Sequence, residues 1–164
     1  MSRVLVVGHA CVDLITRLAR RPGDDEKLEA DVAWFGGGGP GANAAVTLRR
    51  LGHDVSLAVR LGLDPAGAIA ERELVDEGVR CLVPRVEGRT SLAQIQVVGH
   101  ERSIAWKRGD TAPLAPDDSE LDAWLDDTDL LYVDGHEPEC AHRAVRRAAE
   151  RSIPVLADLG TLRE

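Results

Sequence analysis

A glycine-rich stretch at the start of a predicted helix carries polar groups suited to binding a small ligand. Gly36-Gly37-Gly38-Gly39-Pro40-Gly41 precedes Asn43, and an apolar stripe with helical spacing runs on to Gly52. Glycines let a ligand approach the backbone closely because they have no Cβ. Free N–H groups of a first helical turn, at the positive end of the helix dipole, favour polar or anionic ligands. The stretch predicts a binding turn, although a plain turn before a helix would use the same glycines.

Two acidic residues precede this stretch. Asp13 comes soon after the apolar run Val4–Val7, which has the composition of a buried parallel strand, and ligands of open α/β sheets bind at the carboxyl ends of such strands. A carboxylate in an otherwise apolar segment needs a partner, because burying it unpaired is costly. Asp25 lies in a polar turn between Asp24 and Glu26, where a solvated turn residue is the alternative interpretation.

The same glycines match a second, less specific pattern. Gly36, Gly38 and Gly41 have the Gly-x-Gly-x-x-Gly spacing of dinucleotide-binding folds. That fingerprint directly follows the first strand and has an acidic residue about 20 residues later. Here the first strand leads into a separate excursion before the glycines are reached, so we discount a dinucleotide-dependent oxidoreductase.

The rest of the chain alternates strands and helices. Apolar runs predict core strands at 4–7, 55–61, 79–83, 129–133 and 153–157, and helices are predicted at 40–51, 66–77, 116–125 and 137–151. Alternating residues predict two further strand pairs, 11–18 with 28–35 and 91–98 with 102–106. This order predicts an α/β fold with a parallel sheet and a small β-flap.

Composition limits the partners of this chain. Its 164 residues are 44% apolar and 29% charged, which is typical of one globular domain. A net charge of −8 argues against nucleic acid and anionic membranes, because both select basic surfaces. No apolar run reaches the roughly 20 residues that span a bilayer, and the N-terminus has no signal-peptide pattern. We therefore expect a cytoplasmic protein.

The cysteines indicate neither a disulfide framework nor a metal centre. Cys11, Cys81 and Cys140 are odd in number and widely spaced, which disfavours disulfides. His136 and His142 lie close to Cys140, but no second ligand pair of zinc-finger type accompanies them. We predict no metal site.

Several motifs together resemble the ribokinase-like (PfkB) carbohydrate kinase family. They are Val6–Gly8 with Asp13, Pro22–Glu26, Gly38–Ala45 with Leu51-Gly52, Gly62-x-Asp64-x-x-Gly67 and Val133–Gly135. The helix start Gly-Gly-x-x-x-Asn is similar to the family's first signature, and the stretch Asp134–Glu139 is most similar to the ketohexokinase and sulfofructose-kinase branch. The resemblance implies a Rossmann-like three-layer αβα fold with a parallel sheet, plus a small β-sheet lid formed by residues of about 11–35 and 90–107.

The resemblance also implies an activity and a set of site residues. Members transfer the γ-phosphate of ATP to a sugar hydroxyl, usually with Mg²⁺. By likeness, Arg108 faces a phosphate, and a small-molecule sugar is bound by Asp13, Asp25, Gly38, Gly39, Asn43 and Asp134. A homodimer formed through the lid strands is compatible with the same likeness.

One signature of the family is missing. Its Gly-Ala-Gly-Asp segment, which resembles the source of the catalytic base and the anion hole for the transferred phosphate, does not occur in the 164 residues. Members are considerably longer, so the chain resembles the N-terminal part, residues 1–164, of one ribokinase-like domain whose C-terminal half is absent. We expect neither ATP nor Mg²⁺ to bind this chain tightly.

Two functional hypotheses remain. The chain is the sugar-binding half of an ATP-dependent carbohydrate kinase, inactive alone, or it is a non-catalytic remnant domain that binds a sugar or a partner. Sugar binding without ATP binding would favour the first hypothesis.

Overall fold

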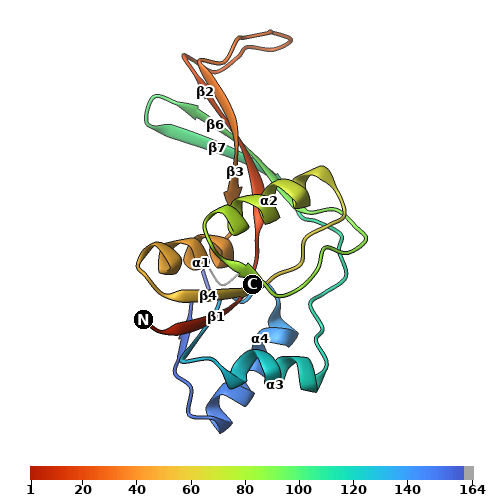
Figure 1. The fold of residues 1–164 in the computed structure, drawn as a ribbon. Helices are drawn as coiled ribbons and strands as arrows, with labels where there is room; N and C mark the ends of the chain where they lie inside the picture. The colour runs from red at the N-terminus through yellow and green to blue at the C-terminus, as the bar shows by residue number, and fades with distance from the viewer. Residues whose placement is uncertain (161–164) are drawn as a thin grey trace.

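A five-stranded parallel sheet forms the centre of the body in the computed structural model, which describes residues 1–160 (Figure 1). The strand order is β5-β4-β1-β8-β9. The strands are β1 (Arg3–Val7), β4 (Asp54–Ala58), β5 (Arg80–Cys81), β8 (Leu130–Val133) and β9 (Val155–Ala157), and every neighbouring pair is parallel. The predicted parallel sheet is therefore confirmed.

Helices cover both faces of this sheet. Helices α1 (Pro40–Arg50) and α2 (Pro65–Asp76) lie on one face, and α3 (Asp118–Asp126) and α4 (Pro138–Glu150) lie on the other (Figure 1). Successive strand residues point to opposite faces of the sheet. Val4 and Val6 therefore pack against α1 and α2, whereas Leu5 and Val7 pack against α3 and α4. The three-layer αβα arrangement is confirmed.

A second sheet projects from the body (Figure 1). It consists of β2 (Cys11–Leu18), β3 (Val32–Gly38), β6 (Ser91–Val98) and β7 (Glu101–Lys107) in the order β3-β2-β6-β7. Strands β2 and β6 are parallel at its centre, and β3 and β7 pair antiparallel at its edges. We call these four strands the lid sheet.

The strand predicted at 28–35 is wrong at both ends. Strand β3 begins at Val32, opposite Arg17, and the residue before it, Asp31, still donates its N–H to the Arg17 carbonyl at 2.9 Å. It continues to Gly38, because Gly36 and the two glycines after it pair with Asp13, Val12 and Cys11. Most of the predicted glycine turn is therefore strand, and the turn itself is reduced to Gly39, which has a φ of 96° and precedes Pro40.

Strands β4 and β5 are also shorter than predicted. Strand β4 ends at Ala58 and not at residue 61, and β5 contains only two residues. Beyond β4 the backbone leaves the sheet, because the Leu61 carbonyl accepts from the Val86 N–H at 2.9 Å and the Gly62 N–H donates to Thr90 Oγ1 at 2.8 Å. The Asp64 side chain then caps α2 by accepting from the Gly67 N–H at 2.8 Å.

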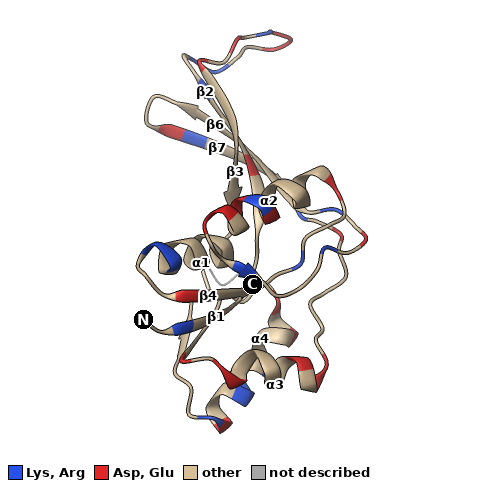
Figure 2. Cartoon of the chain, viewed as in Figure 1, with Lys and Arg blue, Asp and Glu red and all other residues tan. Residues whose placement is uncertain are grey.

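Charged residues of both signs cover the body. Figure 2 shows acidic residues along α2 and α3 and in the adjoining loops, in keeping with the net charge of −8. Within residues 1–160, none of the helices has the length and apolar content required to cross a lipid bilayer.

Candidate functional site

The strand order reverses at the centre of the parallel sheet. Strands β4 and β5 lie on one side of β1, whereas β8 and β9 lie on the other. Ligands of open α/β sheets bind in the crevice that such a reversal leaves at the carboxyl ends of the strands. His9 follows β1 at this edge, and Asp134 follows β8. The topology therefore brings these two residues together.

The Asp134 carboxylate joins three loops at this edge. Its Oδ2 accepts from the His9 N–H at 2.7 Å and from the Gly41 N–H at 2.8 Å, and its Oδ1 accepts from the His136 N–H at 2.9 Å. The residue is only 4% exposed. A buried carboxylate is costly unless it is hydrogen-bonded, and these three backbone donors meet that requirement.

The same carboxylate occupies the N-terminus of α1. The Gly41 N–H is bound by Asp134, the Ala42 N–H donates to the His9 carbonyl at 3.1 Å, and the Asn43 N–H donates to the Gly39 carbonyl at 2.9 Å. Proline at the first helical position has no N–H to offer. The expectation that this turn presents free N–H groups to a ligand is wrong, because the chain itself binds them and places a negative charge at the positive end of the dipole.

Gly41 is where α1 comes closest to the loop after β1. A Cβ at this position would lie 2.8 Å from the His9 nitrogen and 2.9 Å from the Gly8 Cα. Such distances leave no room for any other residue. In this structure the glycine serves the approach of two backbone segments, and the ligand approach proposed from the sequence is not required to explain it.

Asp13 lies at the base of the lid sheet. It pairs with Gly36 across β2 and β3, and its carboxylate occupies the space where Gly38 would carry a Cβ. Among residues 1–160, the Cys11 thiol is the hydrogen-bond donor to this side chain, at 3.3 Å from Oδ1. Burial and the negative charge of Asp13 raise the pKa of Cys11 to about 12, so the thiol stays protonated and Asp13 keeps acceptor sites for a ligand.

Two of the predicted residues line a hollow between α1 and α2. Gly38 and the exposed side chain of Asn43 border this hollow of about 590 Å³. On the α2 side, Glu73 accepts a hydrogen bond from the Gly37 N–H. No sequence motif marked Glu73, because its role depends on where α2 packs against β3.

Two other predicted residues line a different hollow, at the carboxyl ends of β1, β8 and β9. Asp134 and Arg108 border this hollow of about 530 Å³, together with His9 and Pro40. Gly39 lies between the two hollows, and a Cβ there would be 2.6 Å from the His9 carbonyl oxygen. The structure thus places Gly38 and Asn43 at one hollow and Asp134 and Arg108 at the other, whereas Asp13 lines neither.

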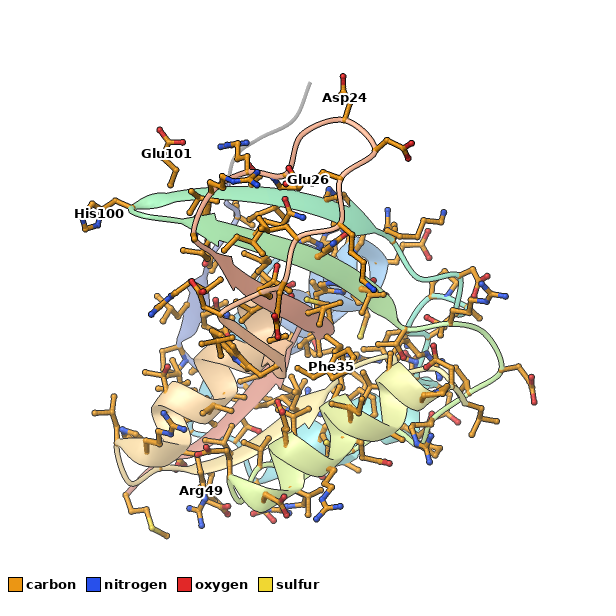
Figure 3. The ribbon with its side chains drawn as sticks, turned by 90° about the horizontal axis from the view of Figure 1, so that it is seen from above. Asp24, Glu26, Phe35, Arg49, His100 and Glu101 are labelled. Carbon is orange, nitrogen blue, oxygen red and sulfur yellow. The ribbon has the colours of Figure 1, made fainter. Side chains whose placement is uncertain are left out.

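Asp25 is not brought to either hollow. It is exposed, has a φ of 56°, and lies in the turn between β2 and β3. Figure 3 shows its neighbours Asp24 and Glu26 at the outer end of the lid sheet, away from the body. Arg20 binds Glu26, and this hydrogen bond, with that from the Gly23 N–H at 2.8 Å, lowers the pKa of Glu26 to about 2.

A stacked pair of histidines borders the strand ends. The rings of His9 and His136 lie 4.8 Å apart at an interplanar angle of 23°. Burial lowers the pKa of His9, and His136 and Arg108 lower it further, while Asp134 opposes them. Sequence reasoning missed His9, although its position directly after Gly8 at the end of the first strand was a usable signal.

The three residues weighed as metal ligands do not converge. His136 stacks on His9, Cys140 is 1% exposed in the core beneath α4, and His142 is exposed on that helix. Within residues 1–160, no group of three His, Cys, Asp or Glu side chains is arranged to hold a metal ion.

Comparison with protein families and curated proteins relates this arrangement to sugar kinases. Residues 1–152 match the family described as pfkB family carbohydrate kinase. An ATP-dependent ribose-1-phosphate kinase of Halopiger xanaduensis is 29% identical over 98% of this chain and 55% of its own length. A ribokinase of Arabidopsis thaliana is 24% identical over 96% of this chain and 44% of its own length. The chain spans about half the length of the curated relatives that it matches.

Solved structures share the fold. The Arabidopsis thaliana ribokinase complexed with ribose and ATP superposes with a TM-score of 0.78 at 24% identity, over 98% of this chain and 54% of that one. A 2-dehydro-3-deoxygluconokinase of Thermotoga maritima superposes with a TM-score of 0.77 at 19% identity, over 99% of this chain and 52% of that one. The fold of this chain is therefore ribokinase-like.

Replacing Asp134 tests whether its carboxylate holds the three loops together. Asp134→Asn places an amide N–H₂ against a backbone N–H donor, so we expect the free energy of unfolding to fall by roughly 1–3 kcal/mol. Chemical denaturation monitored by circular dichroism measures this. Asp24→Asn, in the exposed turn, makes the same charge change and is expected to alter stability by less than about 0.5 kcal/mol. Equal stability of the two variants would contradict the role given to Asp134.

The lowered pKa of His9 is expected to make the stability depend on pH. The pKa of His9 in the folded chain lies below the ordinary value of 6.5, so the unfolded chain binds more protons as the pH falls. We therefore expect the free energy of unfolding to decrease as the pH falls through the unfolded pKa towards the lowered folded one. In His9→Gln, denaturation curves between about pH 7.5 and about pH 6 should show a smaller decrease. An unchanged pH dependence in that variant would remove His9 as its source.

Proposed function

The chain belongs to the pfkB family of carbohydrate kinases, and from this membership we propose that it is the sugar-binding half of an ATP-dependent carbohydrate kinase. The observation that supports this most directly is that Asn43 and Asp134 line hollows on either side of Gly39, while the Asp13 carboxylate lies against the adjacent Gly38. Carboxylate and amide groups suit a polyol, because each accepts or shares the hydrogen bonds of hydroxyl groups.

Each polar side chain has a part in this proposal. Asp13 accepts from sugar hydroxyls with the oxygen lone pairs that Cys11 leaves free. Asn43 contributes an amide from the first turn of α1. Asp134 keeps a fixed orientation through its three backbone donors and offers its remaining lone pairs to the hollow that it lines. The lid sheet would exclude water from the bound sugar.

Asp25 belongs to the proposed site only in a closed arrangement of the lid. Here the outer turn is tied to the lid sheet, since Arg21 pairs with Glu101 at 3.2 Å and donates to Ser103 Oγ at 2.9 Å. Figure 3 shows Glu101 at the tip of the β6–β7 hairpin. We propose that Asp25 reaches the sugar when the lid moves towards the body on binding.

The residues of this chain do not fit ATP and Mg²⁺ as a complete site. The 164 residues lack a Gly-Ala-Gly-Asp segment, and residues 1–160 contain no metal-binding group of three side chains. Phosphoryl transfer depends on positioning and charge stabilisation of the transferred group. We propose that ATP and Mg²⁺ belong to the full-length family enzyme and that this chain alone transfers no phosphate.

The missing segment also favours a second candidate function, a non-catalytic domain that binds a sugar or a partner. Calorimetric titration with pentoses and hexoses, and then with ATP, tests the two candidates. The kinase-half proposal predicts binding of a sugar without tight binding of ATP. Binding of no sugar by a folded chain would overturn it in favour of the partner-binding domain.

Substitution of Asn43 and Asp13 tests the proposed contacts. Asn43→Ala leaves sugar hydroxyls unpaired and is expected to weaken binding by about 1–3 kcal/mol. Asp13→Asn is expected to cost at least as much, because hydrogen bonds to a charged group are stronger. Asp31→Asn, an exposed residue before β3, is the matched control and should bind as the parent does. If Asn43→Ala also bound as the parent does, Asn43 would be removed from the site.

We further propose a homodimer through the face of the lid sheet that carries Asp13. Trp34, Ile15, Ile95 and Ile104 form one row across its four strands, and Trp34 and Ile104 are 42% and 49% exposed. Light scattering should give twice the chain mass of 17.7 kDa. Ile104→Lys should give a monomer, whereas Leu51→Lys, at an exposed position after α1, should not. A monomeric parent chain would contradict the dimer.

A further inference from the structure

Arg60 is a half-buried cation that pairs with no described residue. It follows β4 at the carboxyl edge of the parallel sheet. Its Nε is buried and has no hydrogen-bond partner, and no described residue forms an ion pair with its guanidinium. Withdrawing a charged group from water without a partner is costly. The arginine therefore lacks a negatively charged group that would offset this cost.

Arg60 lines a cavity of about 220 Å³. Three adjacent strands supply cationic or protonatable side chains to it, since Arg60 follows β4, His9 follows β1 and His136 follows β8. Arg108 lines the cavity from the loop after β7. These side chains converge at the edge of the sheet where ligands of this architecture bind.

The loop that carries Arg108 is bound to the segment at the start of β6. The Gly109 N–H donates to Ser91 Oγ at 2.9 Å, and the Asp110 N–H donates to the Arg89 carbonyl at 3.1 Å. A Cβ on Gly109 would collide with the Arg89 carbonyl. Arg108 is therefore held close to the cavity by the start of β6.

Two acids, Glu137 and Glu139, also border the cavity and equal Arg60 and Arg108 in number, but they are not paired with them. Glu137 Oε2 accepts from the Leu114 N–H at 2.9 Å, and Glu139 is exposed in the first turn of α4. Neither forms an ion pair with Arg60 or Arg108. The two guanidinium groups are always charged, and the positive end of the α4 dipole adds to them. Although the chain carries a net charge of −8, the unpaired guanidinium of Arg60 offers an anion a place to bind in this cavity.

We propose that the cavity binds an anionic group of the sugar substrate, so that the substrate is a phosphorylated sugar or a sugar acid. This inference rests on the proposed function. The cavity shares His9, Arg108 and His136 with the hollow of about 530 Å³ that Asp134 lines. An anionic group held by Arg60 thus leaves the hydroxyl-bearing part of the same molecule beside Asp134. Guanidinium groups bind both phosphate and carboxylate in paired hydrogen bonds.

Calorimetry on the full chain tests the proposal with matched pairs of probes. The two pairs of a neutral and an anionic sugar are ribose with ribose 5-phosphate and glucose with gluconate. Inorganic phosphate and ADP are titrated as further probes. At low salt, at least one anionic sugar should bind about tenfold or more tightly than its neutral partner. A tighter-binding ribose 5-phosphate would identify a phosphate subsite, and a tighter-binding gluconate would identify a carboxylate subsite. The affinity difference between the anionic and the neutral sugar should decrease as salt is added.

Arg60→Gln should abolish the preference for the anionic sugar and leave the affinity for the neutral sugar unchanged, which also shows that the variant is folded. Arg60→Lys should retain part of the preference. Arg72→Gln, at an exposed position on α2 that does not line the cavity, makes the same charge change and should retain all of it.

Three outcomes would overturn the inference. Equal affinity for anionic and neutral sugars would remove the anionic subsite and leave the proposed function intact. An Arg60-dependent gain for ADP alone would assign the cavity to the nucleotide. Failure of every sugar, neutral or anionic, to bind would overturn the proposed function as well.

Discussion

The arrangement around the strand ends depends on the buried carboxylate of Asp134. Its three backbone hydrogen bonds join the loop after β1, the first turn of α1 and the loop after β8. The negative charge also takes the place that an acidic residue in the first turn of α1 would fill, and that turn contains none. Four groups of the candidate site are positioned by these segments, because Gly39 and Asn43 belong to the start of α1, and His9 and His136 flank the carboxylate.

Features with a regular pattern in the sequence could be predicted from it. A strand that is buried on both faces, such as Val4–Val7, is apolar throughout and shows no polar alternation. Such apolar runs, with predicted helices between them, were sufficient to predict the parallel sheet. Alternation of apolar and polar residues predicted that 11–18 pairs with the strand after it. The same alternation predicted the hairpin of 91–98 with 102–106. The family followed from motif spacing around Asn43. The finer likeness to the ketohexokinase branch, based on Asp134–Glu139, stays a prediction, as do the roles of the individual site residues.

The remaining features depend on tertiary contacts that no local pattern encodes. Gly36 reads as a turn residue, yet it is strand because Asp13 faces it across the lid sheet. The sequence predicts free N–H groups at the start of α1, yet the Gly41 N–H donates to Asp134, which lies 93 residues away in the chain. Arg60 reads as an ordinary polar residue after a strand, and only its burial without a partner distinguishes it.

The parallel pairing of β2 with β6 has a consequence for the order in which the chain folds. It joins residues 11–18 to residues 91–98, and the Asp134 contact with His9 spans 125 positions. Contacts between such distant positions carry the cost of closing a long loop before they contribute stability, which slows folding. During synthesis β2 and the start of α1 leave the ribosome well before their later partners, β6 and Asp134. The ligand-binding region is thus among the last parts of the chain to become ordered, and Asp13 and the lid strands are exposed to other chains until then.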